Sequence, residues 1–200
     1  MHGVTVVDDI MYVVSDKSST ILLYSTDTYS PLDVVINVNG MKRPTDIVVC
    51  RDDRQLYVAD YYYCIWRVSV DHHSDQEKWL SDESTTHTFH VNALSVTSRS
   101  LLVTSSLPPR LHQYSTTDRQ LLRVVIMPGY VMKLYHGVET TRGTFVVSHR
   151  GTSLDERQYA VSELFTFCHV LVILITIDYV VNALLVDLTT SIHKITVTCV

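Results

Sequence analysis

The stretch PTDIVVCRDDRQLYVADYYYCIWRVS, from Pro44 to Ser69, decides the fold of this chain. It contains three short runs rich in β-branched and aromatic residues, at 47–50, 56–59 and 65–68. Charged or polar residues separate the runs, which is typical of consecutive antiparallel strands. The stretch has no helical periodicity and no catalytic or cofactor motif. It therefore predicts three neighbouring strands. The stretch indicates an architecture and does not by itself indicate an activity.

The same pattern recurs at a regular interval. The run LYVAD at 56–60 has counterparts in MYVVS at 11–15, LLVTS at 101–105 and TFVVS at 144–148. The interval is about 45 residues, and further strands are expected at matching offsets before and after each run. Four strands in such a period are what one blade of a β-propeller requires.

A β-sandwich also consists of short alternating strands, so strands alone do not separate the two folds. The nearly equal intervals favour the propeller. We therefore expect an all-β chain that is a β-propeller fragment of four-stranded antiparallel blades, with a divergent hydrophobic C-terminal tail. The expected blades cover 1–40, 41–83, 84–129 and 130–164, and the tail covers 165–200. Tyr57, Val58, Ile65 and Val68 are expected to pack between neighbouring blades.

The second expected blade resembles the NHL-type repeat. Pro44, Asp46, Ile47 and the run 56–60 carry the resemblance, which weakens to a hydrophobic skeleton in the third and fourth blades. WD-type propellers are the near alternative, although the chain has no W-D or G-H dipeptide. The resemblance implies a six-bladed ring in the common case, which needs about 270 residues. The chain therefore looks like part of a propeller, and an incomplete ring predicts self-association through open blade edges or a longer parent protein.

The resemblance is compatible with several different functions. NHL-type propellers serve ubiquitin ligases of the tripartite-motif class, lyases, lactonase-like enzymes and extracellular proteins. We expect a non-catalytic protein-interaction module with an unknown protein partner. The alternatives are a metal-dependent lactonase-like propeller enzyme and a propeller tethered to a membrane.

Charge and cysteine content exclude several classes of protein. The 16 basic and 21 acidic residues give a net charge of −5 and are scattered, so no nucleic-acid footprint is present. The four cysteines (Cys50, Cys64, Cys168 and Cys199) have no C-x-x-C spacing, which disfavours a structural zinc site and a disulfide scaffold. Reduced thiols and the lack of a secretory signal or glycosylation acceptor favour a cytoplasmic location.

The C-terminal segment differs from the repeats. Residues 164–186 read LFTFCHVLVILITIDYVVNALLV, which is long enough for a membrane span. Asp178 lies inside this run, and no Lys or Arg follows until Lys194, both of which disfavour a span. Further strands at 170–177 and 192–200, or an irregular appended tail, are the favoured interpretations.

Neither the histidines nor the known motifs predict a catalytic or metal centre. The chain has no H-E-x-x-H, G-x-S-x-G, P-loop or G-x-G-x-x-G motif. The run DHHSD at 71–75 carries metal-ligand residue types, and His87 and His90 form a second pair. Adjacent residues of a strand point to opposite faces, so solvated loops are expected instead. We expect no catalytic residues, no metal ligands and no cofactor.

Two sets of residues are candidates for binding. Three consecutive tyrosines in a turn cannot all face inward, so Tyr61, Tyr62 and Tyr63, together with Trp66, are a candidate partner surface. The second set is at the central axis, where the expected alignment of the inner strands groups Gly3, Asp46, Asn92 and Gly137. The axial polar candidates are Asp46, Asn92 and His136. A calcium site would need converging carboxylate and amide oxygens there, and no aligned Glu completes such a set.

Overall fold

The computed structural model describes residues 3–61, 64–81, 90–97, 99–151, 159–167 and 170–179 of the 200-residue chain. Every regular element in these ranges is a β-strand. In chain order they are β1 (Gly3–Val7), β2 (Ile10–Val14), β3 (Thr20–Ser25), β4 (Pro31–Asn37), β5 (Pro44–Cys50), β6 (Gln55–Asp60), β7 (Cys64–Ser69), β8 (Gln76–Ser81), β9 (Val91–Val96), β10 (Ser100–Ser106), β11 (Pro109–Ser115), β12 (Leu121–Ile126), β13 (Lys133–Glu139), β14 (Phe145–Arg150), β15 (Tyr159–Phe167) and β16 (Val170–Tyr179).

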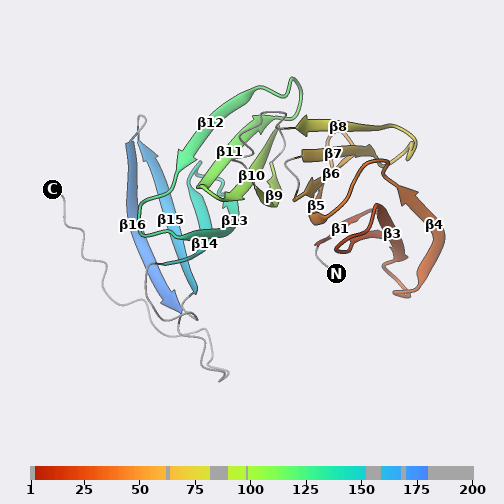
Figure 1. The fold of residues 1–200 in the computed structure, drawn as a ribbon, viewed down its shortest axis with the longest axis horizontal. Helices are drawn as coiled ribbons and strands as arrows, with labels where there is room; N and C mark the ends of the chain where they lie inside the picture. Colours follow the sequence, from red (N-terminus) through yellow and green to blue (C-terminus); the bar gives the residue numbers. More distant parts are fainter. Residues whose placement is uncertain are drawn as a thin grey trace.

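The strands form four antiparallel sheets, each made of four strands that follow one another in the chain. We call β1–β4 blade 1, β5–β8 blade 2, β9–β12 blade 3 and β13–β16 blade 4. The first strand of each blade lies beside the first strand of the next, because β1 contacts β5, β5 contacts β9 and β9 contacts β13. Figure 1 shows the blades side by side in an arc, with these inner strands on the concave side and β4, β8, β12 and β16 at the outer rim. The prediction of an all-β propeller fragment is confirmed.

The hydrophobic core lies between the blades rather than inside any one of them. Successive residues of a strand point to opposite faces of the sheet, so each blade supplies two apolar faces. Val58 and Val68 lie in the cluster between blades 1 and 2, whereas Tyr57 and Ile65 lie in the cluster between blades 2 and 3. A third cluster, which includes Phe145, joins blades 3 and 4. The four core residues expected from the sequence are therefore buried between blades, as predicted.

The fourth blade extends past the expected boundary at residue 164. β15 runs through that position to Phe167, and β16 (Val170–Tyr179) adds the outer strand along its length. The expected strand at 170–177 is thus present as β16, and the one at 192–200 lies outside the described residues. No helix in the described ranges is long and apolar enough to cross a membrane.

The repeat extends to the turns between the third and fourth strands. The third strands of blades 1, 2 and 3 end at Ser25, Ser69 and Ser115, each of which has a side-chain hydroxyl. Each accepts a hydrogen bond from a backbone N–H two or three residues further along, at 3.3, 3.1 and 3.3 Å. A serine hydroxyl at this position satisfies a turn amide that the sheet cannot reach. These three serines are therefore structural parts of equivalent turns.

Candidate functional site

The inner strands of the blades all run in the same direction. The arc of blades therefore has two faces, one at each end of these strands. In blade 2, Pro44 pairs with Asp60, so the start of β5 lies beside the end of β6, and blades 1 and 4 have equivalent pairings. We call the face at which the inner strands begin the upper face, and the opposite one the lower face. The hairpin after β2, Tyr61 after β6, and the connections 38–43 and 127–132 lie on the upper face.

The strand register corrects the expected alignment of the inner strands. Asp46 lies opposite Ala59, next to a bulge in β5. In the other blades, the inner-strand residues at the position equivalent to Asp46 are Gly3, Ala93 and His136. Asn92 and Gly137, which the sequence alignment grouped with Asp46, are each one residue away from this position. A shift of one residue turns a side chain to the other face of the strand, and the bulges that set the register leave no clear mark in the sequence.

Asp46 joins two blades through its carboxylate. Its Oδ2 accepts a hydrogen bond from the backbone N–H of Leu94 in β9 at 2.8 Å, and its Oδ1 accepts one from the N–H of Ile47 at 2.9 Å. Burial raises the pKa of Asp46 above its usual value, although the two N–H groups and the nearby His136 act in the opposite direction. The carboxylate is therefore engaged by backbone donors of blades 2 and 3.

The other axial candidates also contact the backbone of a neighbouring blade. Asn92 Nδ2 donates to the carbonyl oxygen of Leu134 in blade 4 at 3.0 Å. Thr45 occupies the same position one blade earlier, and its hydroxyl donates to the carbonyl oxygen of Val91 at 3.3 Å. His136 Nε2 lies 3.1 Å from the carbonyl oxygen of Leu94. The sequence missed Thr45, although the shared position of Thr45 and Asn92 becomes visible once the register is known.

The axial residues thus act as links between adjacent inner strands. Ser95 adds another link, since its hydroxyl donates to the carbonyl oxygen of Gly137 at 2.9 Å. Each of these side chains bonds to the backbone of a neighbouring inner strand, and Asp46 and His136 engage the N–H and the carbonyl oxygen of the same residue, Leu94. In the part of the chain that the structure describes, no group of three or more His, Cys, Asp or Glu side chains could hold a metal ion.

Tyr61 lies on the upper face, at the hairpin after β6, in a series of contacts that spans three blades. Its ring centroid lies 4.7 Å from the Arg43 guanidinium carbon and 4.9 Å from the ring centroid of His90. Arg43 Nε in turn donates to Asp16 Oδ1 of blade 1 at 3.1 Å. Tyr61 is half-buried, so one part of the ring packs and the rest faces solvent. Tyr62 and Tyr63 lie outside the described residues.

Trp66 does not belong to the exposed surface expected from the sequence. Its side chain is 7% exposed and lies in the core between blades 1 and 2. A Cβ at Gly40 would come within 3.1 Å of the indole, so the tryptophan also fixes how closely the connection between the blades can approach. Because β7 alternates its side chains, Trp66 points into the apolar contact with blade 1 while its neighbour Arg67 points away.

Asp60, the last residue of the LYVAD run, holds the connection between blades 1 and 2. Its carboxylate accepts hydrogen bonds from the backbone N–H groups of Lys42 at 2.8 Å and Arg43 at 3.1 Å. The side chain is 1% exposed. This arrangement positions Arg43 against Tyr61 and explains physically why the strand ends on an aspartate here.

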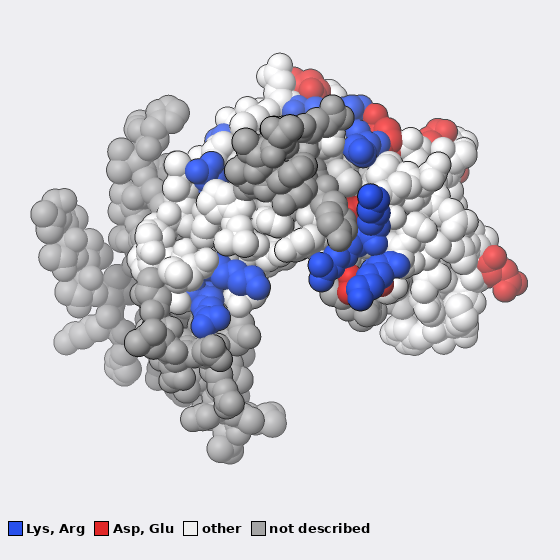
Figure 2. Space-filling view, in the orientation of Figure 1, with Lys and Arg blue, Asp and Glu red and all other residues white. Residues whose placement is uncertain are grey.

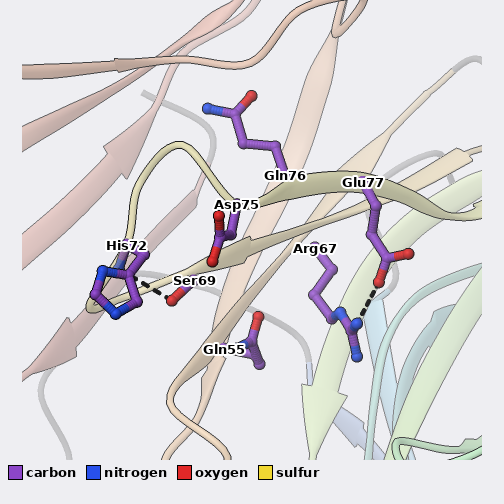
Figure 3. Close-up of a pocket in the computed structure, with 7 residues that line it drawn as sticks. All are labelled: Gln55, Arg67, Ser69, His72, Asp75, Gln76 and Glu77. Atoms are coloured by element: carbon purple, nitrogen blue, oxygen red, sulfur yellow. Dashed lines mark hydrogen bonds and ion pairs between the residues drawn. The ribbon is translucent and has the colours of Figure 1, made fainter.

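A polar cavity of about 480 Å³ lies toward the lower end of blade 2 (Figure 3). It is lined by Gln55, Arg67, Ser69, His72, Asp75, Gln76 and Glu77. Ser, His and Asp occur together here, but the hydrogen bond to the Ser69 hydroxyl comes from the backbone N–H of His72 and not from its ring. Figure 3 shows Arg67 and Glu77 paired on the side of the cavity opposite His72. Ser69 therefore serves the turn, as its counterparts do in blades 1 and 3.

The run 71–75 is an exposed loop beside this cavity, as expected from the sequence. The carboxylate of Asp71 forms an ion pair with Arg54 at 2.9 Å. The hydrogen bond from the guanidinium lowers the pKa of Asp71 below its usual value. Arg54 also contacts Asp8 of blade 1 at 3.0 Å, so this residue links the lower ends of two blades.

Basic side chains are unevenly distributed. On the face seen in Figure 2, Lys and Arg side chains gather beside the concave inner side of the arc, while Asp and Glu side chains lie mostly toward the outer rim. Arg43 lies on the upper face, in the connection between blades 1 and 2 that leads into β5. The environment of Tyr61 therefore combines an aromatic ring with a guanidinium group, a pair that is common in protein interfaces.

No protein-family model and no curated protein sequence matches the chain. Several solved structures are similar in fold. Hydrazine synthase from Kuenenia stuttgartiensis aligns with a TM-score of 0.62 and 13% identity over 82% of this chain and 45% of that chain. The β-propeller domain of Cps50 (Swd1) from Myceliophteria thermophila aligns with a TM-score of 0.62 and 10% identity over 90% of this chain and 59% of that chain.

A chain of a mitotic checkpoint complex aligns with a TM-score of 0.61 and 9% identity over 87% of this chain and 50% of that chain. The chain thus spans about half the length of the solved proteins that it matches. Identities this low establish the fold alone. With the four sheets and their order, these similarities show that the chain has the fold of a four-bladed section of a β-propeller.

Proposed function

We propose that this chain is a non-catalytic protein-interaction module of NHL-like propeller type, and that its partner binds the upper face around Tyr61. The observation that carries the proposal is the difference between the two candidate sites. The axial polar groups are engaged with the backbone of neighbouring blades, whereas Tyr61 and Arg43 present an aromatic ring and a guanidinium at the surface.

The NHL-like assignment rests on the roles of the motif residues. Pro44 begins β5, Asp46 links β5 to β9, and Asp60 accepts hydrogen bonds from the connection that precedes β5. Asp46 and Asp60 thus each hold a junction between two blades. Propellers of this type hold loops on a rigid frame, and loops so placed commonly bind other molecules.

The alternative of a calcium-dependent lactonase-like enzyme would require Asp46 and Asn92 to turn toward a common ion. Each would first lose a hydrogen bond to the backbone of the next blade, which would leave a buried donor or acceptor unpaired. Calorimetric titration with Ca²⁺ separates the proposals. Saturable binding that Asp46→Asn abolishes would favour the enzyme, and no heat of binding would favour the interaction module.

Partner capture from a native lysate tests the upper face directly. The Tyr61→Ser/Tyr62→Ser/Tyr63→Ser variant is compared with Tyr29→Ser, which changes a tyrosine that is 74% exposed on a lower-face hairpin. We expect the triple variant to lose its partners, since each covered ring contributes about 1–2 kcal/mol to association. Tyr29→Ser should retain them. Loss of partners in Asp46→Ala/Asn92→Ala, with unchanged folding and full capture by the triple tyrosine variant, would contradict the proposal.

A photo-crosslinking amino acid at position 61 and another at position 117 provide a second test. Thr117 lies in the lower-face hairpin between β11 and β12 of blade 3 and is exposed. Crosslinks from position 61, with none from position 117, are expected. Equal crosslinking from both faces would show that the captured proteins do not recognise the upper face.

A further inference from the structure

Every contact between neighbouring blades has the same two halves. One blade contributes the face that points toward the next blade, here called its outgoing face, and the next blade contributes its incoming face. The incoming face of blade 2 consists of apolar side chains that blade 1 covers. They include Ile47, Val49, Leu56, Val58 and Val68, all of which are buried.

Blade 1 has the same incoming face, and no described residue of the chain covers it. The register makes Val4 and Val6 the counterparts of Ile47 and Val49, since Val4 pairs with Val13 as Ile47 pairs with Val58. Val4 is 44% exposed and Val6 is 39% exposed, against 1% and 8% for their counterparts in blade 2. Blade 1 therefore has apolar residues at the positions that are covered in blade 2, although its own incoming face is exposed.

The outgoing face of blade 4 is the complementary half. Val138 and Val161 occupy the positions that Val48 and Ile65 have in blade 2, and each is 39% exposed. In blade 2, Ile65 is fully buried and Val48 is partly buried against blade 3. Among the residues that the structure describes, one exposed face of each kind thus lies at each end of the arc (Figure 1).

We propose that these two faces bind each other between two copies of this chain, with blade 4 of one copy packed on blade 1 of the other. The contact is heterologous, because it joins two different surfaces of the same protein. It uses the faces of the end blades that carry Val4 and Val6 in blade 1 and Val138 and Val161 in blade 4. The sequence had suggested the strand edges instead, but the outer strands are edges in every blade, whether or not the ring is complete.

The charges at the lower ends of the faces agree with this pairing. Between blades 1 and 2, Asp8 of one inner hairpin pairs with Arg54 of the next at 3.0 Å. In the contact between copies, the inner hairpin of blade 4 brings Arg142 toward the inner hairpin of blade 1, which carries Asp9. Both residues are exposed and have opposite charges. This proposal does not depend on the binding role of Tyr61.

Sedimentation velocity and light scattering over a range of concentrations test the contact with the full chain. The incoming-face variant is Val4→Lys/Val6→Lys, and the outgoing-face variant is Val138→Lys/Val161→Lys. The matched control is Leu122→Lys/Ile126→Lys, which alters two side chains exposed by 54% and 62% on the outer strand β12. We expect the wild-type chain and the control to associate as concentration rises, and each face variant to remain a monomer.

Mixing the two face variants provides the decisive measurement. Each keeps the face that the other lacks, so an equimolar mixture should form a 1:1 dimer that stops at two copies. A mixture that stays monomeric would overturn the proposal, as would a wild-type chain that is monomeric at every concentration. An outgoing-face variant that still dimerises alone would show contact between two blade 1 faces and would also overturn it.

A charge exchange tests the same contact without changing either apolar face. Asp9→Arg and Arg142→Asp should each weaken association a few-fold, and the two changes in one chain should restore it. Both residues are exposed in hairpins, so folding is not at risk. Equal association of all three variants would contradict the proposed arrangement of the copies.

Discussion

The carboxylate of Asp46 in β5 accepts a hydrogen bond from the backbone N–H of Leu94 in β9, at 2.8 Å. This bond joins the inner strands of two blades that have no backbone pairing with each other. The propeller is therefore held at its axis by side chains that reach from one blade to the backbone of another. Thr45 and Asn92 repeat the arrangement at a second position.

Replacing Asp46 should destabilise the contact between blades 2 and 3. Asp46→Ala leaves the N–H groups of Leu94 and Ile47 without their acceptor, and an unpaired buried donor costs about 1–3 kcal/mol. Urea denaturation should show this loss. Asp27→Ala, at an exposed position of a lower-face turn, is the control and should leave the unfolding midpoint unchanged. An equal effect of both substitutions would contradict the role given to Asp46.

Gly3→Ala should push the inner strands of blades 1 and 2 apart. A Cβ at this position would lie 2.7 Å from the backbone nitrogen of Ile47 and 2.8 Å from the Cα of Asp46. Backbone atoms cannot move aside as a flexible side chain can, so we expect a loss of about 1–3 kcal/mol in unfolding free energy. Gly129→Ala, whose Cβ would meet nothing within 4 Å, should have little effect on thermal unfolding. Equal melting temperatures for the two variants would refute the close approach.

His112 should make the fold sensitive to mild acid. Burial, followed by the charge of Arg110, lowers the pKa of His112 from its ordinary value of 6.5 to about 4. The unfolded chain therefore binds a proton between these pH values while the folded chain does not, and stability falls as the pH is lowered through this range. His112→Gln removes the effect. The difference in unfolding free energy between wild type and variant should be constant above pH 7 and change between pH 6.5 and 4; a constant difference across this range would exclude the mechanism.

Val58→Asp should unfold the domain. Val58 has no exposed surface and lies in the cluster between blades 1 and 2, so an aspartate there would be an unpaired buried charge. Circular dichroism should show the loss of the β-sheet signal at temperatures where the wild type is folded. Val34→Asp changes a valine that is 48% exposed on β4 and should keep the signal. Wild-type-like melting of Val58→Asp would contradict the core assignment.

The sequence by itself determined the strands, their grouping by four and the faces that they bury. The interval between the runs at 11–15, 56–60 and 101–105 is a local, repeated signal, and alternating side chains translate directly into two apolar faces. For this reason Tyr57 and Val58 could be assigned to the core before the structure was known. The strand after residue 164 was harder to assign, because a continuous apolar run has the same composition in a strand as in a membrane span.

Tertiary structure alone decided the register of the inner strands and the roles of the polar residues. Asn92 and Asp46 looked equivalent in the sequence, but bulges shift the strands by one residue and give them different partners. Trp66 looked like a surface aromatic and is buried, since its environment depends on the packing of blade 1. Hydrogen bonds such as the one between Asp46 and Leu94 join residues from different repeats. Their geometry arises only when the blades pack side by side, so no local pattern along the chain records it.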